Sequence, residues 1–203
     1  MKVIVLGPRR PDIISYLQSF GDEVISVEKK ISSEDPMLMK VDFLISYGYR
    51  FILEQELLDL FPQKAINLHI SLLPWNKGAD PNLWSFLDNT PKGVTIHLLD
   101  RGVDTGDILA QQIVEMDAED TLRSSYDKLL KSIEALFHLT WPKIRKGDII
   151  PIPQLGGGSY HKRTDKAAYE LLLIDGWETP VSALIGMTRN SQQKVKYAKY
   201  HNN

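Results

Sequence analysis

The sequence predicts an α/β protein with one doubly wound, mostly parallel sheet. Short apolar runs rich in β-branched residues alternate with segments whose apolar residues recur at helical spacing, and this alternation is typical of βαβ units. The length of 203 residues suits one domain with a proper hydrophobic core. Ligands of such sheets bind beyond the carboxyl ends of the strands, so functional side chains are expected at that edge.

Helices separate the first four predicted strands. Apolar residues recur at helical spacing from Ile13 to Phe20 and predict a helix over residues 11–20. A second helix is expected over residues 54–61. The four strands are predicted at residues 3–6, 23–27, 41–46 and 65–69.

The middle of the chain alternates in the same way. A short helix is expected over residues 81–87, and a β-branched strand over residues 94–99. Residues 121–144 are predicted to form a long amphipathic helix, capped by Thr121 or by the acids before it. The apolar face of this helix consists of Leu122, Leu129, Ile133, Leu136 and Phe137.

Beyond residue 147 the pattern changes. Residues 149–154 resemble an edge strand, the three glycines at 156–158 are expected to form a hinge, and residues 167–173 are helix-like. The end of the chain is mildly basic, and we expect it to be a solvated, frayed tail. The basic residues of this tail are Arg189, Lys194, Lys196 and Lys199.

Composition excludes several classes of protein. Hydrophobic residues make up 43% and charged residues 25% of the chain, the balance of a soluble globular protein. The formal net charge of -2 gives no overall electrostatic footprint for nucleic acid. The absence of Cys excludes disulfides and thiol catalysis and fits a reducing compartment. The first apolar run is too short for a signal peptide, and no membrane span is expected.

Three polar residues stand at the ends of two predicted strands. Alternation along residues 65–69 places Asn67 and His69 on the same side of their strand. Asp104 lies in a turn-rich loop after the later strand, where catalytic groups are often found. Each residue alone also has a structural explanation, as a core hydrogen-bonding group or a turn cap. Because His69 and His97 are far apart in the sequence and Cys is absent, no metal site is expected.

Several short motifs surround these residues in a definite order along the chain. The signal is specific because separated elements match together rather than one short motif alone. The motifs are Asn67-x-His69-x-Ser71-Leu72-Leu73-Pro74, then Gly78, then Gly93-Val94-Thr95, then Asp104-x-Gly106.

In this order the motifs resemble the core of the folate-dependent formyltransferases. The runs at residues 73–81 and 90–97 resemble a narrower branch, the nucleotide-sugar N-formyltransferases, which is close to the formylation domains of nonribosomal peptide synthetases. The resemblance covers roughly residues 1 to 160. It implies a Rossmann-like sheet of the formyltransferase type, with a catalytic domain at residues 1–155 and a short C-terminal extension at residues 156–203.

The resemblance also implies a site for the co-substrate, N10-formyltetrahydrofolate. In this family the pterin ring is held by backbone groups of the loop before the motif strand and of the loop that carries the catalytic Asp. Plain core packing remains open for the aromatic residues of the first loop. The implied folate-binding residues are Tyr49, Arg50, Phe51, Ile52, Leu53, Asp100, Arg101 and Val103.

The acceptor substrate is expected on the other side of the motif. The loop after the first strand lacks the Gly-x-Gly-x-x-Gly fingerprint, so an ordinary dinucleotide cofactor is not expected. Its arginines could still hold a phosphate together with the helix N-terminus, or form an exposed solubilising pair. The residues after Pro74 could meet the nucleotide, although Trp75 could equally be a packing residue. The candidate acceptor-binding residues are Arg9, Arg10, Trp75, Asn76 and Lys77.

Formyl transfer needs fixed donors for an oxyanion and a group that moves a proton near neutral pH. Asn67 and His69 are predicted to supply the donors. Asp104 is predicted to orient His69, to raise its pKa if burial does not outweigh the pairing, or to relay protons through water.

The sequence therefore predicts a cytoplasmic enzyme of surface polysaccharide biosynthesis, a transferase that formylates a nucleotide-linked 4-amino-4,6-dideoxy sugar. A UDP-linked sugar on a pseudaminic-acid-type pathway is favoured. Formylation of a carrier-bound aminoacyl group is the alternative within this chemistry, and a non-catalytic folate-binding or nucleotide-binding module is the alternative of another class. The expected partners are a nucleotide sugar and a reduced folate, with neither nucleic acid nor membrane, and a homodimer is left open.

Overall fold

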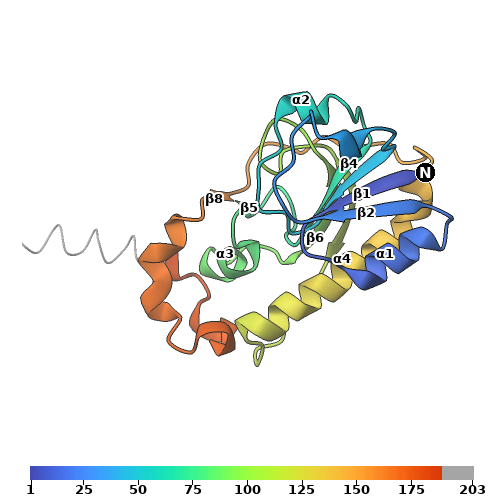
Figure 1. The fold of residues 1–203 in the computed structure, drawn as a ribbon. Coiled ribbons are helices and arrows are strands. Elements are labelled where there is room, and N and C mark those ends of the chain that lie inside the picture. The colour runs from blue at the N-terminus through green and yellow to red at the C-terminus, as the bar shows by residue number, and fades with distance from the viewer. Residues whose placement is uncertain (189–203) are drawn as a thin grey trace, which may run out of the picture.

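A six-stranded sheet in the order β2-β1-β3-β4-β6-β7 forms the centre of the computed structural model (Figure 1). The structure describes residues 1–188. β1 to β4 are parallel to one another, whereas β6 and β7 run antiparallel to their neighbours. The predicted α/β fold with a mostly parallel sheet is confirmed. The strands are β1 (Lys2–Leu6), β2 (Glu23–Val27), β3 (Phe43–Ser46), β4 (Ala65–His69), β6 (Gly93–Leu98) and β7 (Ile108–Ile113).

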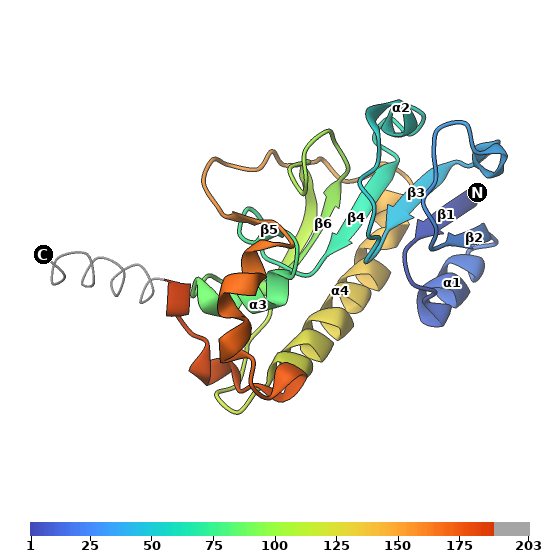
Figure 2. The same cartoon turned by 60° about the vertical axis from the view of Figure 1, so that its left-hand side comes forward.

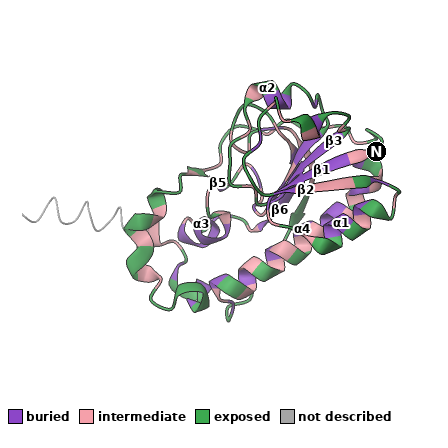
Figure 3. Ribbon diagram, viewed as in Figure 1, coloured by how far each residue is buried: buried purple, intermediate pink, exposed green. Residues whose placement is uncertain are grey.

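Helices cover both faces of this sheet (Figures 1 and 2). α1 (Pro11–Gln18) and the long α4 (Leu122–Ile144) pack on one face, where a large buried cluster includes Ile66 and Leu68 of β4. The short α2 (Gln55–Leu58) and the 3-10 turn η1 (Pro36–Leu38) pack on the other face. In Figure 3 the inner strands are almost entirely buried, as expected for parallel strands that are covered on both sides.

A smaller assembly lies beside the carboxyl end of β4. It contains α3 (Pro81–Leu87) and a two-stranded ribbon of β5 (Lys77–Gly78) and β8 (Tyr160–His161). Three 3-10 segments complete it, and apolar side chains of the first and the third pack with α3 and the start of α4. These segments are η2 (Asp165–Leu172), η3 (Gly176–Glu178) and η4 (Val181–Ala183).

Several predicted boundaries agree with the structure. The helices at 81–87 and 121–144 are confirmed within one residue, and Thr121 is the N-cap of α4. Its side chain accepts from the Ser124 N–H, while the Ser124 side chain accepts from the Thr121 N–H, which completes a capping box.

Other element predictions were wrong. The helix at 54–61 forms only one turn, because Pro62 disfavours the helical conformation at Phe61 and the chain turns through a positive φ at Gln63. Residues 149–154 contribute a single bridge, from Ile152 to Ile108, rather than a strand. The helix at 167–173 is a 3-10 segment that begins at Asp165.

Two further expectations concern a membrane span and the basic C-terminal tail. No helix among residues 1–188 is long and apolar enough to cross a membrane. The basic residues of the predicted tail, Arg189, Lys194, Lys196 and Lys199, lie outside the described residues.

Candidate active site

Asn67 and His69 lie on β4 and face the side of the sheet opposite α4. The alternate residues Ile66 and Leu68 pack into the core beneath α4, so the two polar side chains share the other face, as the alternation predicts. β4 pairs Asn67 with Ser46 of β3 on one side and with His97 of β6 on the other.

Asp104 reaches both residues from the loop between β6 and β7. Its Oδ1 accepts a hydrogen bond of 3.1 Å from Asn67 Nδ2 and lies 3.6 Å from His69 Nδ1. Its Oδ2 accepts a hydrogen bond of 2.8 Å from the Gly78 N–H. Asp104 itself has a positive φ of 55°, an unusual backbone conformation that aims the carboxylate back at the sheet. The structure therefore brings Asn67, His69 and Asp104 together.

His97 belongs to the same cluster, although the sequence indicated it only as a possible metal ligand. Its Nδ1 lies 2.7 Å from the Leu98 carbonyl oxygen, which can only accept, so Nδ1 carries a proton. Its Nε2 lies 3.3 Å from Asn67 Nδ2 and 3.4 Å from Asp104 Oδ1. The register of β4 against β6 places His97 directly opposite Asn67, and antiparallel pairing of these strands is the signal that could have found it.

Burial sets the charge state of His69. Burial lowers the pKa of His69 and outweighs the Asp104 carboxylate, which would raise it; the nearby His97 lowers it further. A raised pKa was expected only if burial did not outweigh the pairing with Asp104, and this condition is not met. The resting His69 is neutral at pH 7.

The charge state of Asp104 has the opposite balance. Burial alone would raise the pKa of Asp104, but His69, His97 and the Gly78 N–H together hold the pKa well below its ordinary value. Asp104 is therefore ionised, and the site holds a buried carboxylate beside two imidazole rings.

The backbone of Asn76 fixes the orientation of the His69 ring. His69 Nε2 lies 3.2 Å from the Asn76 carbonyl oxygen, so in the neutral ring Nε2 carries the proton. The Nδ1 atom is left unprotonated and faces Asp104. Such an arrangement suits a general base, because a proton taken up at Nδ1 would be stabilised by the carboxylate.

The side chain of Asn76 is hydrogen-bonded within the protein. Asn76 is fully buried, its Nδ2 donates to Thr90 Oγ1 at 2.8 Å, and its Oδ1 accepts from Ser159 Oγ at 3.1 Å. Trp75 is 37% exposed and Lys77 lies on the half-buried β5, so both can still meet a ligand.

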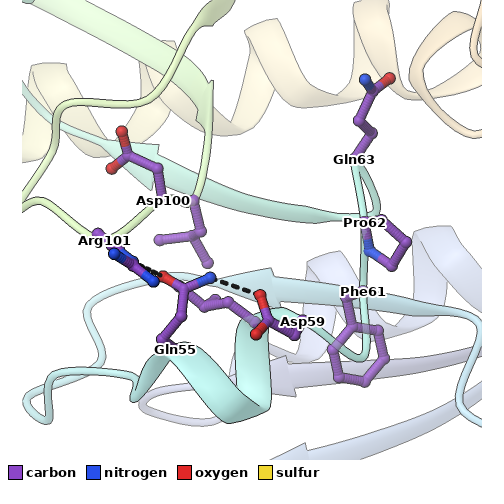
Figure 4. A pocket seen from close by; sticks show the side chains of 9 residues that line it. Gln55, Asp59, Phe61, Pro62, Gln63, Asp100 and Arg101 are labelled. Atoms are coloured by element: carbon purple, nitrogen blue, oxygen red, sulfur yellow. Dashed lines mark hydrogen bonds between the residues drawn. The ribbon is translucent and has the colours of Figure 1, made fainter.

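A depression of about 540 Å³ lies between α2, the turn before β4 and the loop after β6 (Figure 4). Asp100 and Arg101, two of the predicted folate-binding residues, line it. Arg101 Nε donates to Gln55 Oε1, and Gln55 Nε2 donates to Asp59 Oδ1, so a chain of polar side chains forms one wall. Residues 99–101 line this depression and lead directly into Asp104, so one loop contributes to both.

The first predicted folate loop, after β3, contains exposed and packed residues. Arg50, Phe51 and Ile52 are exposed, whereas Leu53 and Tyr49 pack partly against the core on the α2 face. The Tyr49 hydroxyl donates to the Lys29 carbonyl and accepts from the Ile31 N–H, so its polar end is already bonded. Val103, from the second loop, is half-buried beside Asp104.

Arg9 and Arg10 line a second depression, of about 340 Å³, between α1 and α4. The Arg10 guanidinium lies 4.5 Å from the centre of the Tyr47 ring, and the Tyr47 hydroxyl donates to Glu134. Arg10 is therefore engaged in a cation–π contact rather than half of an exposed pair, while Arg9 is exposed. Among residues 1–188 no group of three His, Cys, Asp or Glu side chains is placed to hold a metal ion.

Comparison with known proteins identifies the family. The formyl transferase family model matches residues 26–139, so the chain belongs to this family. Methionyl-tRNA formyltransferase of Thermodesulfovibrio yellowstonii is 37% identical over 139 residues, which are 68% of this chain and 44% of that protein. The chain thus spans less than half the length of this curated relative.

Solved structures give a closer match. The formyltransferase PseJ from Anoxybacillus kamchatkensis, solved with UDP-4,6-dideoxy-4-formamido-L-AltNAc and tetrahydrofolate, is 54% identical with a TM-score of 0.91. The match covers 92% of this chain and 99% of that one. A 4-N formyltransferase from Francisella tularensis shares the fold at 22% identity, with a TM-score of 0.73 over 90% of this chain and 85% of that one.

Proposed function

We propose that this protein is a folate-dependent N-formyltransferase that acts on the amine of a nucleotide-linked 4-amino-4,6-dideoxy sugar. The convergence of Asn67, His69 and Asp104, in a chain 54% identical to PseJ over nearly its whole length, carries this proposal. The ligands in the PseJ structure, a UDP-linked 4-formamido sugar and tetrahydrofolate, favour UDP as the nucleotide and a pseudaminic-acid-type sugar as the acceptor.

N10-formyltetrahydrofolate supplies the formyl group. We assign its pterin end to the loops that contain residues 49–53 and 100–103, because the second of these loops leads directly into Asp104. We assign the nucleotide sugar to Trp75, Lys77 and the exposed Arg9. The positive charges of Lys77 and Arg9 suit a diphosphate.

His69 Nδ1 is the proton-moving atom in this proposal. It takes a proton from the acceptor nitrogen as that nitrogen bonds to the formyl carbon. It then returns a proton to the folate nitrogen as the bond from that nitrogen to the carbon breaks. The charged ring that exists between these steps is paired with the Asp104 carboxylate, 3.6 Å away.

Asn67 stabilises the negative charge on the formyl oxygen. One Nδ2 proton is directed to Asp104, and the other points to His97 Nε2 across 3.3 Å, a long contact. A formyl oxygen in the site would replace this second contact and receive the proton. Asp104 thus holds the asparagine amide in position while the other N–H serves the reaction.

The test is a product assay with purified protein and N10-formyltetrahydrofolate. UDP-, dTDP- and GDP-linked 4-amino sugars are incubated separately, and mass spectrometry detects the formamide. We expect formylation of the UDP-linked sugar, and none with the matching 4-hydroxy sugar as the control. Formylation of methionyl-tRNA or of a carrier-bound aminoacyl group, with no nucleotide sugar accepted, would overturn the proposal. So would folate binding with no formylation of any acceptor.

A further inference from the structure

The chain that follows α4 crosses the edge of the active site and contacts both loops that hold the catalytic groups. We call residues 152–161 the strap; Figure 2 shows it in orange above β6, descending to β5. At its start, Ile152 exchanges two backbone hydrogen bonds with Ile108 at the edge of the sheet. At its end, β8 pairs with β5. The strap lies beyond residue 139, where the match to the family model ends.

Gln154 ties the strap to the loop that carries Asp104. Its Nε2 donates to the Asp104 carbonyl oxygen at 2.9 Å and to the Gly106 carbonyl oxygen at 2.8 Å. The two bonds lie on either side of Thr105 and hold the backbone where Asp104 has a positive φ. A non-Gly residue keeps this conformation only when its surroundings stabilise it.

Ser159 ties the strap to the loop after β4. Its Oγ donates to Asn76 Oδ1 at 3.1 Å and accepts from the Asn76 N–H at 2.9 Å, while its carbonyl accepts from the Lys77 N–H at 2.9 Å. The same short loop presents the Asn76 carbonyl to His69 and the Gly78 N–H to Asp104. Ser159 therefore holds the peptide segment that contacts both catalytic residues.

Two glycines allow the strap to approach this closely. A Cβ at Gly158 would overlap the carbonyl oxygen of Pro74, and a Cβ at Gly78 would overlap the carbonyl oxygen of His161. Both glycines also have positive φ values, of 87° and 88°. The two backbones are therefore in direct contact, and a shift of the strap would move the loop beneath it.

We propose that Gln154 and Ser159 are positioning residues of the formyl transfer reaction, which hold Asp104 and His69 in reacting geometry through the backbones of two loops. This inference rests on the proposed function for its kinetic consequence. Neither side chain bonds to Asn67, His69 or the Asp104 carboxylate itself; each acts on a carbonyl or amide group that in turn fixes a catalytic side chain.

The experiment compares Ser159→Ala and Gln154→Leu with Ser125→Ala. Ser125 is a matched control, because its Oγ also donates to an asparagine Oδ1, that of Asn82, between α3 and α4. For each strap variant we expect kcat to fall about five- to tenfold, with both KM values within about twofold of the parent. In the control, kcat should stay at the parent value although the melting temperature falls.

Nitrogen NMR of the His69 ring gives a second readout, assigned with a His69→Gln variant. The parent ring should carry its proton on Nε2, and Ser159→Ala should shift part of the population to the Nδ1–H form. Thr90→Val removes the other anchor of the Asn76 side chain and should shift the ring in the same direction. An unchanged ring and unchanged kcat in the strap variants, or equal changes in Ser125→Ala, would overturn the proposal. The NMR readout needs no substrate, so it stays decisive even if no acceptor is formylated.

Discussion

Two buried polar clusters contain an asparagine amide and use it differently. Between α3 and α4, Asn82 Nδ2 donates to the Leu122 carbonyl and to Ser125 Oγ, at 3.0 and 3.1 Å. At the carboxyl end of β4, Asn67 Nδ2 instead donates to an ionised carboxylate beside two imidazole rings. The first cluster contains only neutral groups whose protons have fixed partners. The second leaves an unprotonated ring nitrogen next to a buried charge.

This difference distinguishes a buried polar cluster that stabilises the fold from one that serves the reaction. In both clusters the asparagine amide group has hydrogen-bond partners, so hydrogen bonding alone does not distinguish the two clusters. What distinguishes the β4 cluster is that His69 and Asp104 have pKa values displaced from their ordinary ranges, and that His69 has a nitrogen free to accept a proton. We therefore expect substitutions in the first cluster to change stability and those in the second to change turnover.

The largest effect is expected from His69→Gln and Asp104→Asn. Loss of the base, or of the charge that stabilises its protonated form, should lower kcat by about 10²–10⁴-fold. The affinity for the reduced folate, measured by titration calorimetry, should stay within a few-fold, because the assigned pterin contacts are made by residues 49–53 and 100–103 and not by the side chains of His69 or Asp104. Turnover near that of the parent in both variants would remove the proposed mechanism.

A smaller effect, of another kind, is expected from Asn82→Ala. The substitution leaves the Ser125 hydroxyl and the Leu122 carbonyl without their partner, so the free energy of unfolding should fall by about 1–3 kcal/mol. Urea denaturation measures this change, and kcat of the folded protein should remain within about twofold of the parent. A large fall in kcat without loss of stability would show that the α3–α4 cluster also serves the reaction.

The sequence was sufficient to predict the parallel half of the fold and the three converging residues. The strands that end in Ser46 and His69 are short apolar runs, and a two-residue period fixes which side chains share a face. β7 was missed because its last three residues are exposed and it lies at the sheet edge, where the alternation is weak. His97 was missed because its proximity to Asn67 depends on the pairing of two strands 30 residues apart.

Contacts made by the strap could not be predicted in the same way. Gln154 and Ser159 stand in a polar, glycine-rich segment without periodicity, so nothing local indicates which groups they meet. Their partners lie about 50 and 83 residues earlier in the chain. The direction of the His69 pKa shift could not be predicted either. It depends on whether burial, which lowers the pKa, outweighs the charge of Asp104, which raises it, and burial is a property of the packed molecule.

The smallest expected effect is the response of His69 to pH. It distinguishes the β4 cluster from the Asn82 cluster, because the Asn82 cluster has no ionisable side chain. Burial lowers the folded-state pKa of His69 below its unfolded value of ~6.5. The unfolded chain therefore binds the proton more readily, so the contribution of neutral His69 to stability is fully present above ~6.5 and is lost as the pH falls towards the folded pKa. The acidic limb of kcat should follow the same group and lie below ~6.5.

Asp104→Asn tests which charge acts on this ring. The carboxylate raises the pKa of His69 against the larger effect of burial, so its removal should lower the pKa further, while His97 still opposes protonation. NMR titration of the His69 ring should find the lower value, and the acidic limb of the residual turnover should move in the same direction. Asn82→Ala is the control and should leave the titration of His69 unchanged. An equal or higher pKa in Asp104→Asn would mean that the carboxylate does not stabilise the protonated ring, and its role would then be to hold Asn67 and the Gly78 backbone.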